Sequence, residues 1–172
     1  MIYIHIPFCK SRCLYCDFFS TTSSDLKDDF VKALLKEIEG RAEELRFARA
    51  NTIYIGGGTP SQLDAKHLTD IFDALQRVAP LQEDAEVTIE CNPDDITPEF
   101  VEALKATPVN RVSMGVQTFD DNLLRLLRRR HTSAQAHRAV SLLREAGYSN
   151  ISLDLMYGLP GQSLEDWEAT LQ

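Results

Sequence analysis

Apolar positions recur along this chain with two different periods, one typical of β-strands and one typical of α-helices, and segments of the two kinds alternate. Five short runs combine aliphatic or aromatic residues with an alternation of two, a pattern typical of β-strands. Each run stops at a glycine, a proline or a polar residue that favours a turn. The pattern therefore predicts five strands, which cover residues 1–8, 52–55, 86–91, 111–117 and 151–157.

Helical spacing of apolar residues fills the segments between these runs. A polar stretch at residues 20–24 can cap a long amphipathic helix that we expect to end near Arg49. A second helix, over residues 68–78, has Ser61 or Asp64 as a cap. Further helices are expected from Thr97 to about residue 106, over residues 120–127 and 133–146, and from the capping-box pattern at residues 163–166.

Strands that alternate with helices predict an α/β protein with a parallel sheet and right-handed crossovers, as an open sheet or a barrel. The 172 residues fit one domain, residues 1–172, without an internal repeat or a linker. The last predicted helix has barely begun at residue 172, and a further strand should follow it. We therefore expect an incomplete domain.

Composition and net charge limit which kinds of molecule the protein is expected to bind. Hydrophobic residues make up 44% of the chain and charged residues 26%, as in a soluble globular protein. A net charge of −8 argues against non-specific binding of nucleic acid, and the one basic cluster, Arg125 with residues 128–131, is too short to reverse it. We expect no transmembrane segment and no signal peptide, and hence a cytoplasmic protein.

Three of the four cysteines fall within eight residues, in the pattern CxxxCxxC formed by Cys9, Cys13 and Cys16. Thiolates so close in sequence can converge on one metal centre, and cysteine is the usual ligand of iron–sulfur clusters. Three ligands leave one iron of a four-iron cluster open to a small molecule. The alternatives are a zinc site completed by a histidine such as His5, or free buried cysteines. Cys91 is expected to be a small buried residue.

Polar residues gather where the predicted strands end, which is where parallel α/β proteins bind ligands. Glycines at 56–58 let backbone groups approach a ligand closely, although a glycine turn can also be purely structural. The other polar residues at these strand ends could each be a hydrogen-bonded core group, but together they favour a polar ligand. They are Glu90, Asn92, Gln117 and Asp154. The arginine cluster is either a solvated face or a source of one arginine aimed at a carboxylate.

Five motifs occur in order and together resemble the radical S-adenosylmethionine (SAM) superfamily. They are CxxxCxxC, Gly-Gly-Gly-Thr-Pro, Glu-Cys-Asn-Pro, Ser-Met-Gly-Val-Gln and Asp-Leu-Met-Tyr-Gly-Leu-Pro-Gly-Gln. Within it, the chain is similar to the branch that holds oxygen-independent coproporphyrinogen III oxidase and the HemW haem chaperones. The resemblance implies a parallel-stranded partial (β/α) barrel, truncated after the fifth strand. Such chains are about twice as long, with a sixth barrel unit and a carboxyl-terminal domain.

The resemblance also implies roles for individual residues. Cys9, Cys13 and Cys16 would hold a [4Fe-4S] cluster, and S-adenosyl-L-methionine would chelate its open iron. In the superfamily the reduced cluster passes one electron to the sulfonium and a carbon–sulfur bond breaks. No catalytic residue of the protein itself is assigned. The expected contacts of the cofactor are Tyr3, Tyr15, Gly57, Gly58, Thr59, Glu90, Gln117, Arg129 and Asp154.

The branch is distinguished at Phe18. The oxidases carry a further cysteine two residues after the third, whereas this chain carries Phe18 there, which resembles the chaperones. Haem or a porphyrin, a one-electron donor protein and haem acceptor proteins would then be its partners. The alternatives are a coproporphyrinogen oxidase and a structural zinc-binding domain. The chaperone-like chains usually carry Gly-Arg-x-His where this chain has Arg128-Arg129-Arg130-His131.

Overall fold

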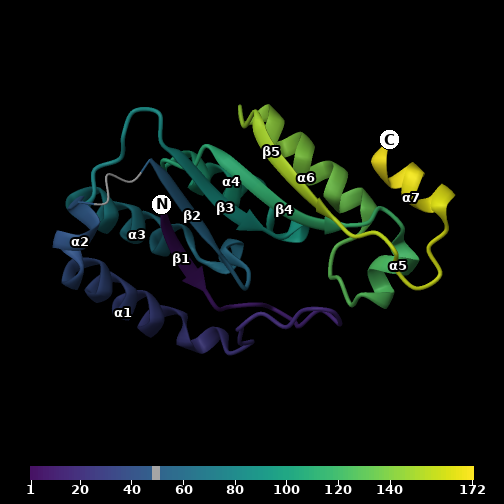
Figure 1. Ribbon diagram of the computed structural model, residues 1–172, viewed down its shortest axis with the longest axis horizontal. Coiled ribbons are helices and arrows are strands. Elements are labelled where there is room, and N and C mark those ends of the chain that lie inside the picture. Colours follow the sequence, from purple (N-terminus) through teal and green to yellow (C-terminus); the bar gives the residue numbers. More distant parts are fainter. Residues whose placement is uncertain (48–50) are drawn as a thin grey trace.

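A single parallel sheet of five strands organises the molecule (Figure 1). The structure is a computed structural model and describes residues 1–47 and 51–172. The sheet order follows the chain order without exception. All five predicted strands are confirmed, as β1 Ile2–Ile6, β2 Thr52–Gly57, β3 Glu86–Cys91, β4 Arg111–Gln117 and β5 Asn150–Leu155.

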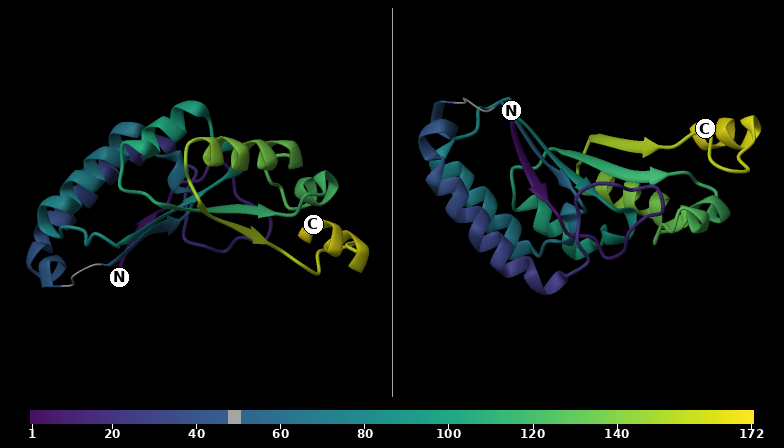
Figure 2. Two further views of the ribbon diagram at one scale, coloured as in Figure 1. Left: turned by 90° about the horizontal axis from the view of Figure 1, so that it is seen from above. Right: turned by 60° about the horizontal axis from the view of Figure 1, so that its bottom comes forward.

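Helices cover one face of this sheet and leave the other face open (Figure 2). A parallel sheet in which every strand neighbours the next, with right-handed crossovers, must place its helices on one side. This is the topology of part of a barrel and differs from a doubly wound open sheet, in which the strand order reverses. The predicted partial (β/α) barrel is therefore the observed fold.

The helices are confirmed with one correction. The long helix predicted after residue 24 is two helices, α1 and α2, because Arg41 leaves the helical conformation with φ −101° and ψ 18° directly after Gly40. Its predicted end near Arg49 lies outside the described residues. The α-helices within the described residues are α1 Lys27–Gly40, α2 Ala42–Phe47, α3 Ala65–Val78, α4 Pro98–Lys105, α5 Asp121–Leu126, α6 Ser133–Glu145 and α7 Leu164–Leu171.

Some of the helix caps predicted from the sequence are present in the structure and others are not. Thr97, Thr132 and Ser163 each accept a backbone N–H in the first turn of the helix that follows, as capping residues do. The polar stretch at 20–24 does not cap α1, which begins behind the 3₁₀ turn η1 Ser24–Leu26 without a side-chain cap. Neither predicted cap of α3 is confirmed. Ser61 lies in the turn η2 Pro60–Gln62 and its hydroxyl donates to a carboxylate, and Asp64 occupies the N-cap position without a side-chain hydrogen bond.

The two faces of the sheet differ sharply in chemistry. Side chains that alternate along β1 to β4 on the helix side, such as Ile6, Ile55, Ile89 and Met114, are completely buried in the main core. On the open side the same strands carry tyrosine, histidine, glutamate, serine and glycine. A parallel sheet that is covered by apolar packing on both faces carries apolar side chains on both. The polar open face instead indicates a ligand site.

No helix among residues 1–47 and 51–172 is long and apolar enough to cross a membrane.

Candidate cofactor site

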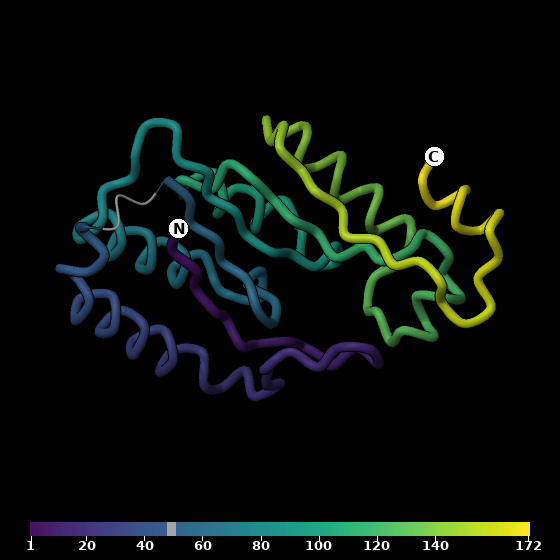
Figure 3. Tube along the Cα trace, viewed as in Figure 1, coloured from purple at the N-terminus to yellow at the C-terminus, as the bar shows by residue number. Residues whose placement is uncertain are grey.

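The segment that carries the three clustered cysteines, the cysteine loop (residues 9–16), leaves the carboxyl end of β1 and returns toward α1 (Figure 3). Two backbone hydrogen bonds close its base, from Cys9 N–H to the Thr21 carbonyl at 2.9 Å and from Thr21 N–H to the Pro7 carbonyl at 2.7 Å. A third, from Leu14 N–H to the Leu127 carbonyl at 3.1 Å, holds its far end against α5. The loop therefore lies across the strand ends, as predicted.

One cavity of about 170 Å³ gathers nearly all the predicted site residues. It is bordered by the cysteine loop, the loop after β2, the ends of β3 to β5 and the segment between α5 and α6. The predicted residues that line it are Cys9, Cys13, Tyr15, Cys16, Gly57, Gly58, Thr59, Glu90, Gln117, Arg129 and Asp154. Tyr3 does not line this cavity. It borders a second hollow, beside α1, with His5 and Phe19.

Gly57, the last residue of β2, and Gly58, which follows it, are needed by the protein's own packing. The N–H of Gly58 donates to the Ile6 carbonyl at 2.7 Å, and a Cβ at Gly58 would lie 2.8 Å from the carbonyl oxygen of Phe8. A Cβ at Gly57, whose φ is +112°, would lie 2.6 Å from the ring of His5. The glycine turn thus has a structural role, because this packing brings the cysteine loop next to β2; its predicted contact with a ligand stays a prediction.

Glu90 is held on the open face by two donors from β2. Its Oε1 accepts from the Tyr54 hydroxyl at 2.7 Å, and its Oε2 accepts from the Gly57 N–H at 3.0 Å. Burial, and then the hydrogen bond to Glu90, raise the pKa of Tyr54 to about 12, so this tyrosine remains a donor at neutral pH. Tyr54 was not predicted from the sequence. Its place opposite Tyr3 in the β1–β2 register is the signal that could have identified it.

Arg129 is the cation of the cavity wall that contacts a cysteine thiol. One guanidinium nitrogen donates to the Sγ of Cys13 at 3.3 Å, and the other reaches the side-chain oxygen of Asn92 and the Gly115 carbonyl. Its third nitrogen, Nε, is buried and makes no hydrogen bond within the described residues. An unpaired buried donor is costly, and a bound acceptor would satisfy it.

The neighbours of Arg129 make other contacts, although Arg130 also borders the cavity. Arg128 is exposed and adopts φ +57°, the left-handed conformation that favours glycine. Arg130 forms ion pairs with Asp94 at 3.0 Å and Asp95 at 3.3 Å. Within the basic cluster Arg125 and Arg128 are thus solvated, while Arg130 is paired with two carboxylates of the protein itself.

Gln117 and Asp154 complete the polar wall. Gln117 ends β4 with φ +69°, at a register shift against β5. Asp154 is exposed and lies 3.4 Å from the Ser113 hydroxyl, which can donate to its carboxylate. A carboxylate with solvent on its remaining side keeps acceptor capacity for a hydroxyl or ammonium group.

Tyr15 lies within the cysteine loop, between two thiols and Arg129. Burial is the main cause that raises the pKa of Tyr15 to about 12, while the Arg129 cation opposes the rise. The tyrosine therefore offers a neutral ring and a hydroxyl donor to the cavity.

The donor set of the cysteine loop suits a cluster of several metal atoms. Cys9, Cys13 and Cys16 are free thiols, partly exposed, that border one cavity, and Thr59 donates to the Sγ of Cys9 at 3.5 Å. The described residues contain no group of three or more His, Cys, Asp or Glu side chains arranged around a single ion. Each thiolate of a four-iron cluster binds a different iron, so this finding concerns single-ion sites. Cys91 is buried in the core, and burial raises its pKa well above the usual value.

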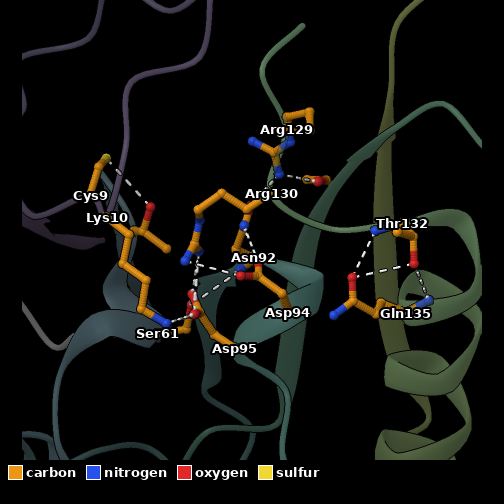
Figure 4. A network of polar contacts seen from close by, with 12 residues as sticks. Cys9, Lys10, Ser61, Asn92, Asp94, Asp95, Arg129, Arg130, Thr132 and Gln135 are labelled. Carbon is orange, nitrogen blue, oxygen red and sulfur yellow. Dashed lines mark hydrogen bonds and ion pairs between the residues drawn. The ribbon is translucent and has the colours of Figure 1, made fainter. Parts of the chain in front are cut away.

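Several residues next to the cavity were not predicted as site residues. Figure 4 shows them as a polar network that joins the loops beneath the cysteine loop. Paired opposite charges in the sequence, the two aspartates after Pro93 and the arginines at 128–130, are the signal that could have identified part of it. Its members include Lys10, Ser61, Asp94, Asp95 and Arg130.

Comparison with known proteins identifies the family of the chain. The family model described as the Radical SAM superfamily matches residues 3–172. The chain is 42% identical over 165 residues to a protein named heme chaperone HemW from Lactococcus lactis, covering 95% of this chain and 42% of that one. It is also 42% identical over 171 residues to HemW of Bacillus subtilis, covering 98% and 45%. The chain thus spans less than half the length of these curated relatives.

Solved structures show the same fold. Coproporphyrinogen III oxidase (HemN) from Escherichia coli, described as a radical SAM enzyme, superposes with a TM-score of 0.88 at 32% identity over 99% of this chain and 40% of that chain. Elp3 of the archaeon Methanocaldococcus infernus superposes with a TM-score of 0.63 at 23% identity over 87% of this chain and 39% of that chain. The second likeness shows the fold alone.

Proposed function

The chain belongs to the radical SAM superfamily, and we propose that it is the cluster-binding and SAM-binding core of a HemW-like haem chaperone. One observation carries the proposal. Three thiols, a guanidinium with an unpaired buried nitrogen, and two carboxylates border the same cavity at the strand ends. The similarity to proteins named heme chaperone HemW supports the choice within the superfamily. Residues 1–172 are proposed to form one core unit.

Cys9, Cys13 and Cys16 would hold a [4Fe-4S] cluster, which when bound supplies one electron to the sulfonium of SAM. The protein's part is to stabilise the negative thiolates. Thr59 and Arg129 donate to two of the three sulfur atoms, at 3.5 and 3.3 Å. Donors of this kind, one of them charged, support a cluster of negative ligands in a partly buried site.

The other polar groups would bind and orient SAM. Arg129 offers a permanent cation for a carboxylate, Glu90 and Asp154 offer acceptors for an ammonium or a ribose, and Gln117 offers both donors and acceptors. Glu90 arrives with both oxygens already held by Tyr54 and Gly57, so its position is fixed before a ligand binds. A preorganised set of this kind orients a zwitterionic ligand without reordering its own side chains.

Haem, a one-electron donor protein and haem acceptor proteins are the proposed partners. The match covers less than half of each relative's length. We therefore assign no haem site to residues of this chain. Haem binding would be measured by titrating haem into the chain and following the haem absorption spectrum, with serum albumin excluded from the buffer.

A second candidate function is oxidation of coproporphyrinogen III, which the TM-score of 0.88 to the oxidase favours. Phe18 distinguishes the two candidates, because the oxidases that this chain resembles carry a cysteine there. In the structure Phe18 is 72% exposed and cannot contribute a thiolate. Anaerobic incubation of the reconstituted protein with coproporphyrinogen, SAM and a reductant separates the two. Release of carbon dioxide with a decarboxylated product would overturn the chaperone proposal.

The cluster itself is tested by a matched pair of cysteine variants. After anaerobic reconstitution, Cys13→Ala should retain little iron and sulfide, whereas Cys91→Ala should retain the wild-type content. Loss of the cluster in Cys91→Ala would show the ligand assignment to be wrong. Stoichiometric zinc without sulfide in the wild-type protein would favour the structural zinc alternative.

A further inference from the structure

The carboxylate of Asp95 lies buried at the meeting point of the loops that border the cavity. Asp95 belongs to the 3₁₀ turn η3 Pro93–Asp95, directly after β3, and its side chain is only 3% exposed. Three side chains donate to it, Lys10 at 3.0 Å, Ser61 at 2.9 Å and Arg130 at 3.3 Å. Both carboxylate oxygens are therefore engaged.

Each donor to Asp95 comes from a different loop. Lys10 belongs to the cysteine loop after β1, Ser61 to the turn after β2, and Arg130 to the segment between α5 and α6, beyond β4. Figure 4 shows the three side chains converging on Asp95. One carboxylate thus joins the loops that follow the first four strands.

The same network continues to Arg129. Asn92 receives a hydrogen bond from Arg129 through its side-chain oxygen, and its amide donates to Asp94 at 2.5 Å. Arg130 pairs with Asp94 as well as with Asp95. The guanidinium that points into the cavity and the guanidinium that pairs with Asp95 are consecutive residues, so fixing Arg130 limits where Arg129 can lie.

We propose that Asp95 is a positioning residue that holds the cysteine loop and the Arg129 segment in register with each other. A buried carboxylate requires its donors, because an unpaired charge away from water is strongly unfavourable. The exposed pairs on the helices, such as Lys66 with Asp70, have no such requirement and constrain little. Asp95 does not touch the proposed ligands. The consequence for cofactor binding rests on the proposed function, whereas the positioning itself does not.

The apo protein offers a direct readout through its own cysteines. Three thiols lie in the cysteine loop and the fourth, Cys91, is buried in the core. Alkylation of the reduced chain by iodoacetamide, followed by mass spectrometry, measures both sets at once. In Asp95→Asn we expect the loop thiols to react at least fivefold faster than in the wild type, with the Cys91 rate unchanged.

Two further variants keep this test decisive. Asp94→Asn is the matched control, since Asp94 also pairs with Arg130 but makes no contact with Lys10 or Ser61; its loop thiols should react within twofold of the wild-type rate. Lys10→Gln removes only the link from the cysteine loop and should accelerate the loop thiols about threefold. Wild-type rates in both Asp95→Asn and Lys10→Gln would overturn the proposal. So would a faster Cys91 in both, because that indicates general unfolding.

Cofactor binding is the second readout. After reconstitution, Asp95→Asn should take up iron but bind SAM about tenfold more weakly, with a weaker change of its electron paramagnetic resonance spectrum on addition of SAM. Wild-type SAM affinity in this variant would overturn the effect on the site. If the wild type takes up no iron, the proposed function fails, while the thiol rates still decide the role of Asp95.

Discussion

The guanidinium of Arg129 donates to the Sγ of Cys13 across 3.3 Å, although the two residues are 116 positions apart in the chain. The contact joins the segment between α5 and α6 to the cysteine loop, and it puts a permanent positive charge beside a proposed cluster ligand. Among the residues that the structure describes, the Nε of this guanidinium has no hydrogen-bond partner. In the proposed function, Arg129 would serve both the cluster and the ligand of its open iron.

Replacing Arg129 with lysine should weaken SAM binding about tenfold and leave the iron content unchanged. Lysine keeps the charge but loses the planar set of donors that reach Cys13, Asn92 and a ligand together, and a tenfold loss corresponds to about 1.4 kcal/mol. Equilibrium binding of SAM to the reconstituted protein measures the effect. Arg125→Lys, on the exposed side of α5, is the control. Equal affinity in wild type and Arg129→Lys would show that Arg129 does not bind the cofactor.

Arg128→Gly should stabilise the protein by about 0.5–1 kcal/mol. Arg128 holds φ +57°, which costs a residue with a Cβ about 1–2 kcal/mol, while glycine adopts it freely. The gain is reduced by the greater freedom of glycine in the unfolded chain. Urea unfolding of the apo protein checks the sign. A clear loss of stability would mean that the Arg128 side chain contributes more than its backbone conformation costs.

Gly58→Ala should destabilise the fold by about 1–3 kcal/mol, as overpacking does. The new Cβ would lie 2.8 Å from the Phe8 carbonyl oxygen and 2.9 Å from that of Ile6, and neither backbone atom can move without displacing the cysteine loop. Gly40→Ala is the matched control, because a Cβ there meets nothing within 4 Å. Thermal unfolding followed by circular dichroism should separate the two variants. Similar melting temperatures would contradict the packing role of Gly58.

His131 should make the protein less stable in mild acid. Its Nε2 donates to the Val116 carbonyl at 3.1 Å, and burial, followed by the Arg129 cation, lowers the pKa of His131 to about 4 from its usual 6.5. Below pH 6.5 His131 takes up a proton in the unfolded chain but not in the folded chain. The free energy of unfolding that His131 contributes above pH 6.5 is therefore lost as the pH falls toward 4. The loss from this group between pH 7.5 and 5 should be on the order of 1–2 kcal/mol.

Urea unfolding at the two pH values measures this loss. His131→Gln keeps a donor for the Val116 carbonyl but cannot take up the proton, so its stability should fall less between the two pH values. His137→Gln, at an exposed position, should fall as much as the wild type. An identical pH dependence in His131→Gln and wild type would contradict a buried neutral histidine.

Most of the secondary structure could be predicted from sequence because its causes are local. Alternation marks each strand, and side chains at Thr97 and Ser163 cap the helices that follow them. The break at Arg41 was missed because the apolar spacing continues across it into α2. A periodic pattern reports which face is buried and does not report a local change of backbone angle.

The site could be predicted in part, because parallel strands bring their carboxyl ends to one edge. Tyr3 is the exception, since it lies on β1, two strands away from Glu90 on β3, and borders the second hollow. The network around Asp95 could not be predicted in this way. Lys10 and Asp95 are 85 positions apart, and only the packing of three loops makes them neighbours.

The central claim is that the three thiols hold a four-iron cluster with one iron open to SAM. Electron paramagnetic resonance of the anaerobically reconstituted, dithionite-reduced protein, recorded with and without SAM, tests it most directly. The account predicts a reduced four-iron signal that changes when SAM is added. A signal indifferent to SAM, or none in a protein that carries zinc in place of iron, would contradict it.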